Sequence, residues 1–193
     1  MSLDVEFKKK EQRKYSISNR LKLNKSVKIN SKFFLNTLKN EKWFSDRNIF
    51  GSFISIKTEI STLELNNILQ ENKKTLCLPI VLDDNIGRLC FKSFKNGEKL
   101  SPGKYGVKEP IEGSFYLPEI IFTPCLAYDL EGFRLGYGGG FYDKTIEYFE
   151  SLNHNFLTVG FAFDDQKIKK VAHNKFDKKL NYILTEKQLY EIL

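Results

Sequence analysis

Short apolar runs that are rich in β-branched and aromatic residues predict the buried strands of this chain. They cover residues 48–56, 74–81, 88–94, 119–123, 156–163 and 180–184. Apolar residues recur at helical spacing in residues 63–70, after Thr62 as a candidate N-cap, and in residues 145–152. We also expect a helix over residues 186–193. Because strands alternate with helices, the pattern predicts a three-layer α/β/α fold with a largely parallel, Rossmann-like open sheet.

Residues 1–40 are highly charged and predict an N-terminal helical segment packed on the sheet. Ser16 or Ser18 could cap a helix, so we expect two helical pieces with a break near these serines. Basic residues cluster at Lys8, Lys9, Lys10, Arg13 and Lys14. Such a cluster is usually a solvated helix face, and the alternative is that one or two of the cations reach a nucleotide phosphate.

Length and composition favour one globular domain over residues 1–193, since the chain has 193 residues of which 41% are hydrophobic. No apolar run approaches the roughly 18 residues of a membrane span, and no apolar signal segment follows the charged N-terminus. Cys77, Cys90 and Cys125 are too scattered for a disulfide framework or a zinc site. We therefore expect a cytoplasmic protein. The formal net charge of +7 indicates an anionic partner, either nucleic acid or a nucleotide with a polyanionic small molecule.

A glycine-rich loop within residues 133–144 connects the strand at 119–123 to the helix at 145–152. Glycine lets a backbone approach a ligand closely, and the N–H groups at a helix start suit a phosphate. Arg134 can add a forked contact, and Asp143 an oxygen ligand for Mg²⁺. The loop is neither a Walker A loop nor a good dinucleotide fingerprint. From glycine content alone, a surface loop without a ligand is an equally good interpretation.

Two further candidates follow from their position in the pattern. Glu59 lies between the strand at 48–56 and the helix at 63–70, which is where open α/β sheets bind ligands. The alternative for Glu59 is an ordinary exposed carboxylate. Tyr105, in the loop-like stretch 100–110, could stack on a flat ring or could simply cover the edge of the core.

The order of residues in the glycine loop is more specific than its glycine content. Arg134-Leu-Gly-Tyr-Gly-Gly-Gly-Phe-Tyr-Asp143, preceded by Pro124-Cys-Leu-Ala-Tyr-Asp129, resembles the signature of the 5-formyltetrahydrofolate cyclo-ligases, also called methenyltetrahydrofolate synthetases. Leu78-Pro79 and Tyr105-Gly-Val-Lys-Glu-Pro110 resemble further motifs, and all of these fall in the order of the family.

The resemblance implies a ligase that uses ATP and Mg²⁺. The ATP-binding residues would be Lys8, Arg134, Leu135, Gly136, Tyr137, Gly138, Gly139, Gly140, Phe141 and Tyr142. Of these, Arg134 and Lys8 would be the catalytic cations, although Lys9 or Lys10 could serve instead of Lys8. The folate-binding residues would be Ile54, Glu59, Tyr105 and Tyr142, and the Mg²⁺ ligands would be Asp143 and Asp177.

The reaction implied by the resemblance is an ATP-driven ring closure. The formyl oxygen of 5-formyltetrahydrofolate would attack the γ-phosphate of ATP, and the neighbouring anilino nitrogen would then attack the activated formyl carbon. Loss of phosphate would leave 5,10-methenyltetrahydrofolate. Such a site must align two substrates and neutralise charge as the phosphoryl group moves. ATP and 5-formyltetrahydrofolate are thus the expected partners of a monomer that binds neither membrane nor nucleic acid.

The chain departs from the family pattern at a few positions. Cys125 stands where glycine is usual and could narrow the folate pocket, and Asn181 replaces an aspartate. Phe141 replaces a tyrosine, and Lys144 a frequent arginine. Three alternatives stay open: an RNA-binding protein that uses the same basic surface, a phosphosugar-handling enzyme, and an inactive relative that binds nucleotide without turnover. The RNA-binding alternative predicts exposed aromatic residues interleaved with Lys and Arg.

Overall fold

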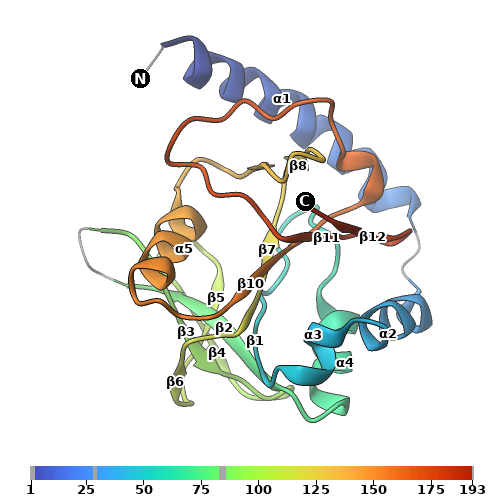
Figure 1. The fold of residues 1–193 in the computed structure, drawn as a ribbon, viewed down its shortest axis with the longest axis vertical. Helices are drawn as coiled ribbons and strands as arrows, with labels where there is room; N and C mark the ends of the chain where they lie inside the picture. Colours follow the sequence, from blue (N-terminus) through green and yellow to red (C-terminus); the bar gives the residue numbers. More distant parts are fainter. Residues whose placement is uncertain (1–2, 28–29, 83–85, 193) are drawn as a thin grey trace.

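The computed structural model describes residues 3–27, 30–82 and 86–192, and within these residues a mixed β-sheet forms the centre of the molecule (Figure 1). In spatial order its strands are β12 (Leu189–Glu191), β11 (Tyr182–Leu184), β10 (Leu157–Phe161), β7 (Ile120–Pro124), β1 (Ile49–Gly51), β2 (Thr75–Val81), β3 (Leu89–Ser93) and β6 (Phe115–Tyr116). Neighbours from β11 through β2 are parallel, and β12, β3 and β6 add antiparallel edges. The prediction of an α/β fold with a largely parallel sheet is confirmed.

Helices cover both faces of this sheet, because successive strand residues point to opposite faces. The helices involved are α2 (Ser31–Lys39), α3 (Lys42–Asp46), α4 (Leu63–Glu71) and α5 (Phe141–Ser151). Leu76 and Leu78 of β2 belong to the core shared with α2, α3 and α4, whereas Cys77 packs with Phe149 of α5. Figure 1 shows α5 on one side of the strands and α2, α3 and α4 on the other.

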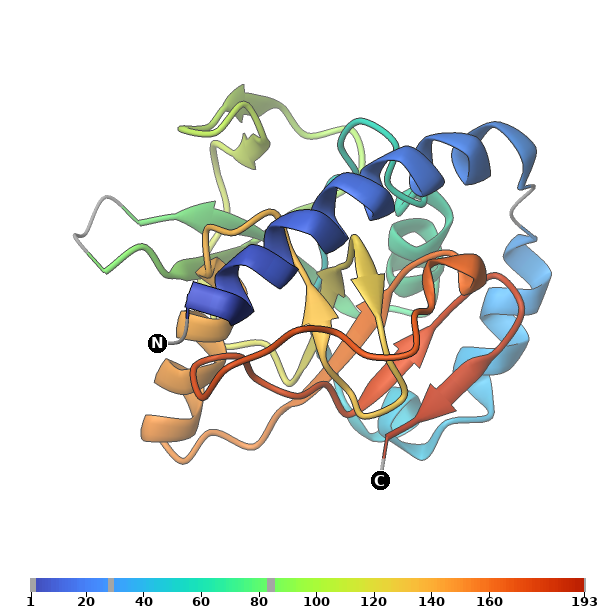
Figure 2. The ribbon, with the colours of Figure 1, turned by 90° about the horizontal axis from the view of Figure 1, so that it is seen from above.

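A long helix, α1 (Leu3–Ser26), crosses the carboxyl ends of the strands from the side of α5 toward α2 (Figure 2). The expected break near Ser16–Ser18 is wrong, since α1 is continuous there. Ser16 is buried, and Gln12 bonds the backbone of residues 170 and 172. These tertiary contacts hold the helix together despite the modest helix propensity of serine. The side chain of Asn30 instead caps α2.

The remaining elements are short. They are the hairpin of β4 (Leu100–Pro102) with β5 (Lys108–Pro110), the pair β8 (Ala127–Tyr128) with β9 (Arg134–Leu135), and the 3₁₀ turn η1 (Asp164–Gln166). The terminal helix expected at 186–193 is wrong, because β12 pairs with β11 there and Tyr190 packs into a small core cluster. None of the helices in the described ranges is long and apolar enough to cross a membrane.

Candidate functional site

The glycine loop lies between β9 and α5, at the end of the sheet that α1 covers. Gly138 and Gly140 have φ angles of +107° and +67°, which side chains with a Cβ rarely adopt. Gly140 is the N-cap of α5 and has no side chain to bond the N–H groups of the first turn. A Cβ at Gly139 would lie 2.4 Å from the ring of Phe141. The loop therefore presents bare backbone at a helix N-terminus, which favours a phosphate.

Cations from α1 and from β9 surround this loop. The Arg13 Nε donates to the carbonyl oxygen of Gly136 at 3.0 Å, and the Arg13 guanidinium lies 3.4 Å from where a Cβ of Gly138 would be. Arg134 is only 9% exposed, and its guanidinium donates to Asp143 Oδ1 at 3.1 Å. The site thus has fixed positive charge on two sides of the loop.

The structure separates the candidate lysines of α1. Lys8 is exposed and pairs with Asp4 at 2.7 Å, on the solvent side of the helix. Lys9 is 7% exposed and pairs with Asp177 at 2.6 Å. Lys9 is therefore the lysine that faces the site, which was an alternative in the sequence interpretation and not its first choice. The signal was available in the i, i+4 spacing of Lys9 and Arg13, which places both on one helix face.

The two candidate metal ligands come from different segments that meet beside α5. Asp143 lies in the first turn of α5, and its Oδ1 also accepts the backbone N–H of Lys178 at 3.0 Å. This bond brings the turn that carries Asp177 next to α5. Both oxygens of Asp177 accept from Lys9, so Asp177 serves as a lysine partner in this structure. Two carboxylates beside a phosphate loop fit Mg²⁺, which is usually held by one or two carboxylates together with substrate phosphates.

Glu59 is a buried carboxylate at the other end of the site. Its Oε2 accepts the backbone N–H of Ile56 at 2.9 Å, and its Oε1 lies 3.8 Å from the guanidinium of Arg20. Burial raises the pKa of Glu59, while the Ile56 N–H and the charges of Arg20 and Lys57 oppose the rise. The sequence pattern pointed to Glu59 but missed Arg20, which lies seven residues after Arg13 and hence on the same face of α1.

Tyr142 and Cys125 lie between the two ends of the site. Burial raises the pKa of Tyr142, which also senses the opposing charges of Glu59 and Arg134. Burial likewise raises the pKa of Cys125 to about 11, with Arg134, Glu59 and Arg20 as charged neighbours. Both side chains are therefore neutral near pH 7, and they place the glycine loop and Glu59 within one connected environment.

Tyr105 and Ile54 have different surroundings. Tyr105, between β4 and β5, is half exposed, and its ring centroid lies 5.0 Å from that of Phe141 at the start of α5. Ile54 packs against the core beside α4 and lines a hollow of about 380 Å³ with Thr62 and Phe94. The structure thus brings Tyr105 next to the glycine loop, whereas Ile54 lies on the side of α4.

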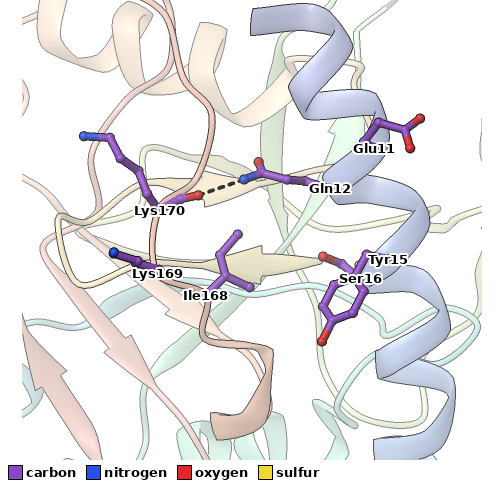
Figure 3. A pocket seen from close by; sticks show the side chains of 7 residues that line it. All are labelled: Glu11, Gln12, Tyr15, Ser16, Ile168, Lys169 and Lys170. Carbon is purple, nitrogen blue, oxygen red and sulfur yellow. Dashed lines mark hydrogen bonds between the residues drawn. The ribbon is translucent and has the colours of Figure 1, made fainter.

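A second hollow of about 380 Å³ lies between α1 and the segment 168–170 (Figure 3). Its lining comprises Glu11, Gln12, Tyr15, Ser16, Ile168, Lys169 and Lys170. This groove is on the flank of α1 next to the face that carries Lys9, Arg13 and Arg20. We place the candidate site at the glycine loop and not in the groove, because the buried charges and the bare helix N-terminus converge at the loop.

The departures from the family motifs are accommodated by local packing. The side-chain oxygen of Asn181 accepts from the Thr158 N–H at 2.8 Å and from its hydroxyl at 3.1 Å, so it ties the chain before β11 to β10. The Cys125 thiol lies against the Thr123 carbonyl at 3.7 Å. Asn181 thereby has a structural role at the sheet.

Comparison with known proteins assigns the family. The model of the 5-formyltetrahydrofolate cyclo-ligase family matches residues 8–186. The chain belongs to this family of enzymes. It is 32% identical over 137 residues to a 5-formyltetrahydrofolate cyclo-ligase of Haemophilus influenzae, a match that covers 68% of this chain and 72% of that protein. It is 29% identical over 144 residues to the cyclo-ligase of Escherichia coli K12, covering 72% of this chain and 78% of that protein.

Solved structures carry the same fold as this cyclo-ligase family member. The NMR structure of a 5,10-methenyltetrahydrofolate synthetase of Aquifex aeolicus matches with a TM-score of 0.77 at 26% identity, covering 95% of this chain and 92% of that one. A 5,10-methenyltetrahydrofolate synthetase of Mycoplasma pneumoniae matches with a TM-score of 0.67, covering 92% of this chain and 98% of that one. At 17% identity, the second match supports the fold alone.

Proposed function

We propose that this protein catalyses the ATP- and Mg²⁺-dependent cyclisation of 5-formyltetrahydrofolate to 5,10-methenyltetrahydrofolate, with release of ADP and phosphate. One observation supports the proposal: a glycine-capped helix N-terminus, which suits a phosphate, and a buried carboxylate lie in one site. Tyr142, in the first turn of α5, lies near both Arg134 on the phosphate side and Glu59 on the other. The membership of the cyclo-ligase family supports the same conclusion.

The glycine loop would hold the phosphates of ATP. The N–H groups at the start of α5 can donate to phosphate oxygens, and Arg13, Arg134 and Lys9 can neutralise their charge. Arg134 and Lys9 are each paired with a carboxylate in this structure. Phosphates would compete for these cations, so ATP binding is expected to rearrange the two ion pairs.

Asp143 and Asp177 would hold Mg²⁺ in the complex with ATP. When bound, the ion would help to neutralise the negative charge of the phosphates. Arg134 and Lys9, released from these carboxylates, would turn to the phosphoryl group. The exchange of partners leaves each carboxylate and each cation paired, which limits the cost of their partial burial.

Glu59 would orient the folate by accepting hydrogen bonds from the amino and ring N–H groups of the pterin. The formyl oxygen then forms a bond to the γ-phosphorus, and the bond between that phosphorus and the β–γ bridging oxygen breaks to give ADP. The anilino nitrogen next bonds the formyl carbon, its proton passes to an oxygen of the departing phosphate, and the carbon–oxygen bond breaks to release that phosphate. The residues named here align the substrates and balance charge, and none acts as a general base.

The decisive experiment follows absorbance in the band of the methenyl product. Protein is mixed with 5-formyltetrahydrofolate, ATP and Mg²⁺, and matched samples leave out ATP or contain a chelator. We expect the absorbance to rise only in the complete mixture. If folded protein that binds both substrates gives no rise, the proposal is wrong and the protein is an inactive relative that binds nucleotide.

A further inference from the structure

Arg20 of α1 is almost fully buried, with 1% of its surface exposed. Its guanidinium contacts three other segments of the chain. The Nε donates to the Thr58 hydroxyl at 3.1 Å, Nη1 donates to the Cys125 carbonyl oxygen at 3.2 Å, and Nη2 donates to the Tyr137 hydroxyl. Nη1 also lies 3.8 Å from Glu59 Oε1. One side chain therefore joins the Glu59 turn to the glycine loop.

The burial of a guanidinium is costly unless its donors are bonded and its charge is balanced. Each contact of Arg20 therefore depends on the others, since removal of one acceptor leaves a buried donor unpaired. A second contact links the same two segments, because the ammonium of Lys57 lies 5.3 Å from the ring centroid of Tyr137. The Glu59 turn and the Tyr137 end of the loop are thus held together by two cations.

We infer that Arg20 is a positioning residue, which fixes the carboxylate of Glu59 and ties it to Tyr137 so that the folate end and the phosphate end of the site are ordered together. The inference rests on the proposed function, which assigns folate to the Glu59 end of the site and phosphate to the glycine-loop end. Arg20 is buried, and all three of its donor nitrogens bond other residues of the chain. Its effect on binding is transmitted through Glu59 and Tyr137.

Charge is the second part of this role. Burial favours the protonated form of Glu59, and the groups around it are Arg20 of α1, Lys57 of its own turn, Tyr142 of α5 and Cys125 after β7. Tyr142 and Cys125 are neutral near pH 7, so the Ile56 N–H and the two cations are what favour the carboxylate. Loss of Arg20 would raise the pKa of Glu59 further. As the pH is lowered, folate binding by the variant would then begin to weaken at a higher pH than folate binding by the wild type.

The test uses the variants Arg20→Met, Arg20→Lys, Tyr137→Phe and the double variant Arg20→Met/Tyr137→Phe. Lys25→Met, an exposed change in the last turn of the same helix, is the control. Dissociation constants are measured for 5-formyltetrahydrofolate alone and for a non-hydrolysable ATP analogue alone. Hydrogen exchange of residues 136–140 reports the order of the loop without any substrate.

We expect Arg20→Met to weaken folate binding about 10- to 100-fold. Tyr137→Phe should weaken binding of the ATP analogue less than about 10-fold and should speed up hydrogen exchange in the loop. Added to Arg20→Met, Tyr137→Phe should change little more, because the link is already broken. Arg20→Lys keeps the positive charge, so the pH profile of folate binding should stay as in the wild type. Because lysine lacks the forked guanidinium, hydrogen exchange in the loop should nevertheless become faster.

Fully additive effects of Arg20→Met and Tyr137→Phe would overturn the inference, as would unchanged loop exchange in Tyr137→Phe. If Arg20→Met does not fold, the half-exposed Tyr137→Phe and the charge-conserving Arg20→Lys decide by the same readouts. If the wild type makes no methenyl product, the proposed function fails, whereas loop exchange still tests the Arg20 link. The two failures are therefore distinguishable.

Discussion

The two ends of the candidate site are built in opposite ways. The phosphate end consists mainly of backbone from one continuous stretch, residues 136–140, and it is largely exposed. The folate end depends on buried side chains, Glu59 and Arg20, from segments 39 residues apart, where each balances the other's charge. A substitution leaves the backbone N–H groups of the phosphate end in place and removes only the charge of a cation beside them, whereas a buried ion pair fails when either partner is lost. The two ends should therefore respond differently to substitution.

The largest effect is expected at the phosphate end from Arg134→Ala. Loss of this cation should lower kcat about 10²- to 10³-fold, because in the proposed reaction Arg134 would stabilise charge on the transferring phosphoryl group. Steady-state rates of methenyl product formation measure the change, and circular dichroism checks the fold. Lys170→Ala, an exposed lysine paired with Glu131, is the matched control and should leave the rate unchanged. A wild-type rate in Arg134→Ala would remove this residue from the mechanism.

At the folate end, Glu59→Gln should weaken binding of 5-formyltetrahydrofolate about 10- to 100-fold, since an amide cannot accept the same charge-assisted hydrogen bonds. Binding of an ATP analogue should weaken less, by under about 10-fold, because the loss of the Glu59 charge loosens Arg20 but leaves its hydrogen bond to Tyr137 in place. Titration calorimetry with each ligand gives both numbers. If both affinities fall equally, the division of the site into two ends is wrong.

Lys8 and Lys9 offer a matched pair of substitutions on one helix turn. Lys9→Met should raise the KM for ATP about 10-fold, because Lys9 faces the site beside Asp177. Lys8→Met should change it less than about 2-fold, because Lys8 pairs with Asp4 in solvent. Initial rates over a range of ATP concentrations distinguish the two. The reverse order of effects would restore Lys8 as the ATP-binding lysine.

The smallest effect concerns stability and pH. Burial raises the pKa of Glu59 above its ordinary value of 4.5, so the native state holds the proton more tightly than the unfolded state. The contribution of Glu59 to stability is then fully present below the unfolded pKa and is lost as the pH rises through the native pKa. The melting temperature of Glu59→Gln relative to wild type should therefore increase from about pH 4 to about pH 7. A constant difference across this range would contradict the shift.

Local sequence predicted the parts of the site that are local. The glycine loop, the start of a helix after it and the place of Glu59 beyond a strand all depend on residues close together in the chain. The apolar run at residues 74–81 likewise predicted the strand that the structure shows as β2. The bounds were less accurate: the expected strand at 48–56 is only Ile49–Gly51, because the chain then turns and the Thr62 hydroxyl bonds the carbonyl of Phe53.

Tertiary contacts decided the rest. Serines at 16 and 18 suggested a break in the first helix, but α1 is continuous there, and Gln12 on the preceding turn bonds the backbone of residues 170 and 172. The sequence predicted a helix over residues 186–193, yet residues 189–191 form β12 and pair with the edge of β11. Backbone pairing at a sheet edge can override local preference, since it satisfies donors and acceptors that would otherwise be unpaired.

By itself, the sequence of this cyclo-ligase family member determined an α/β fold, a glycine loop suited to phosphate and the family motif at that loop. Only the tertiary structure decided which cations face the candidate site. Lys9 donates to Asp177, which lies 168 positions later in the sequence, and Arg20 donates to the carbonyl oxygen of Cys125, 105 positions later. Glycine conformation and helix starts are properties of neighbouring residues. The pairing of buried charges depends instead on which distant segments the fold brings within hydrogen-bond distance.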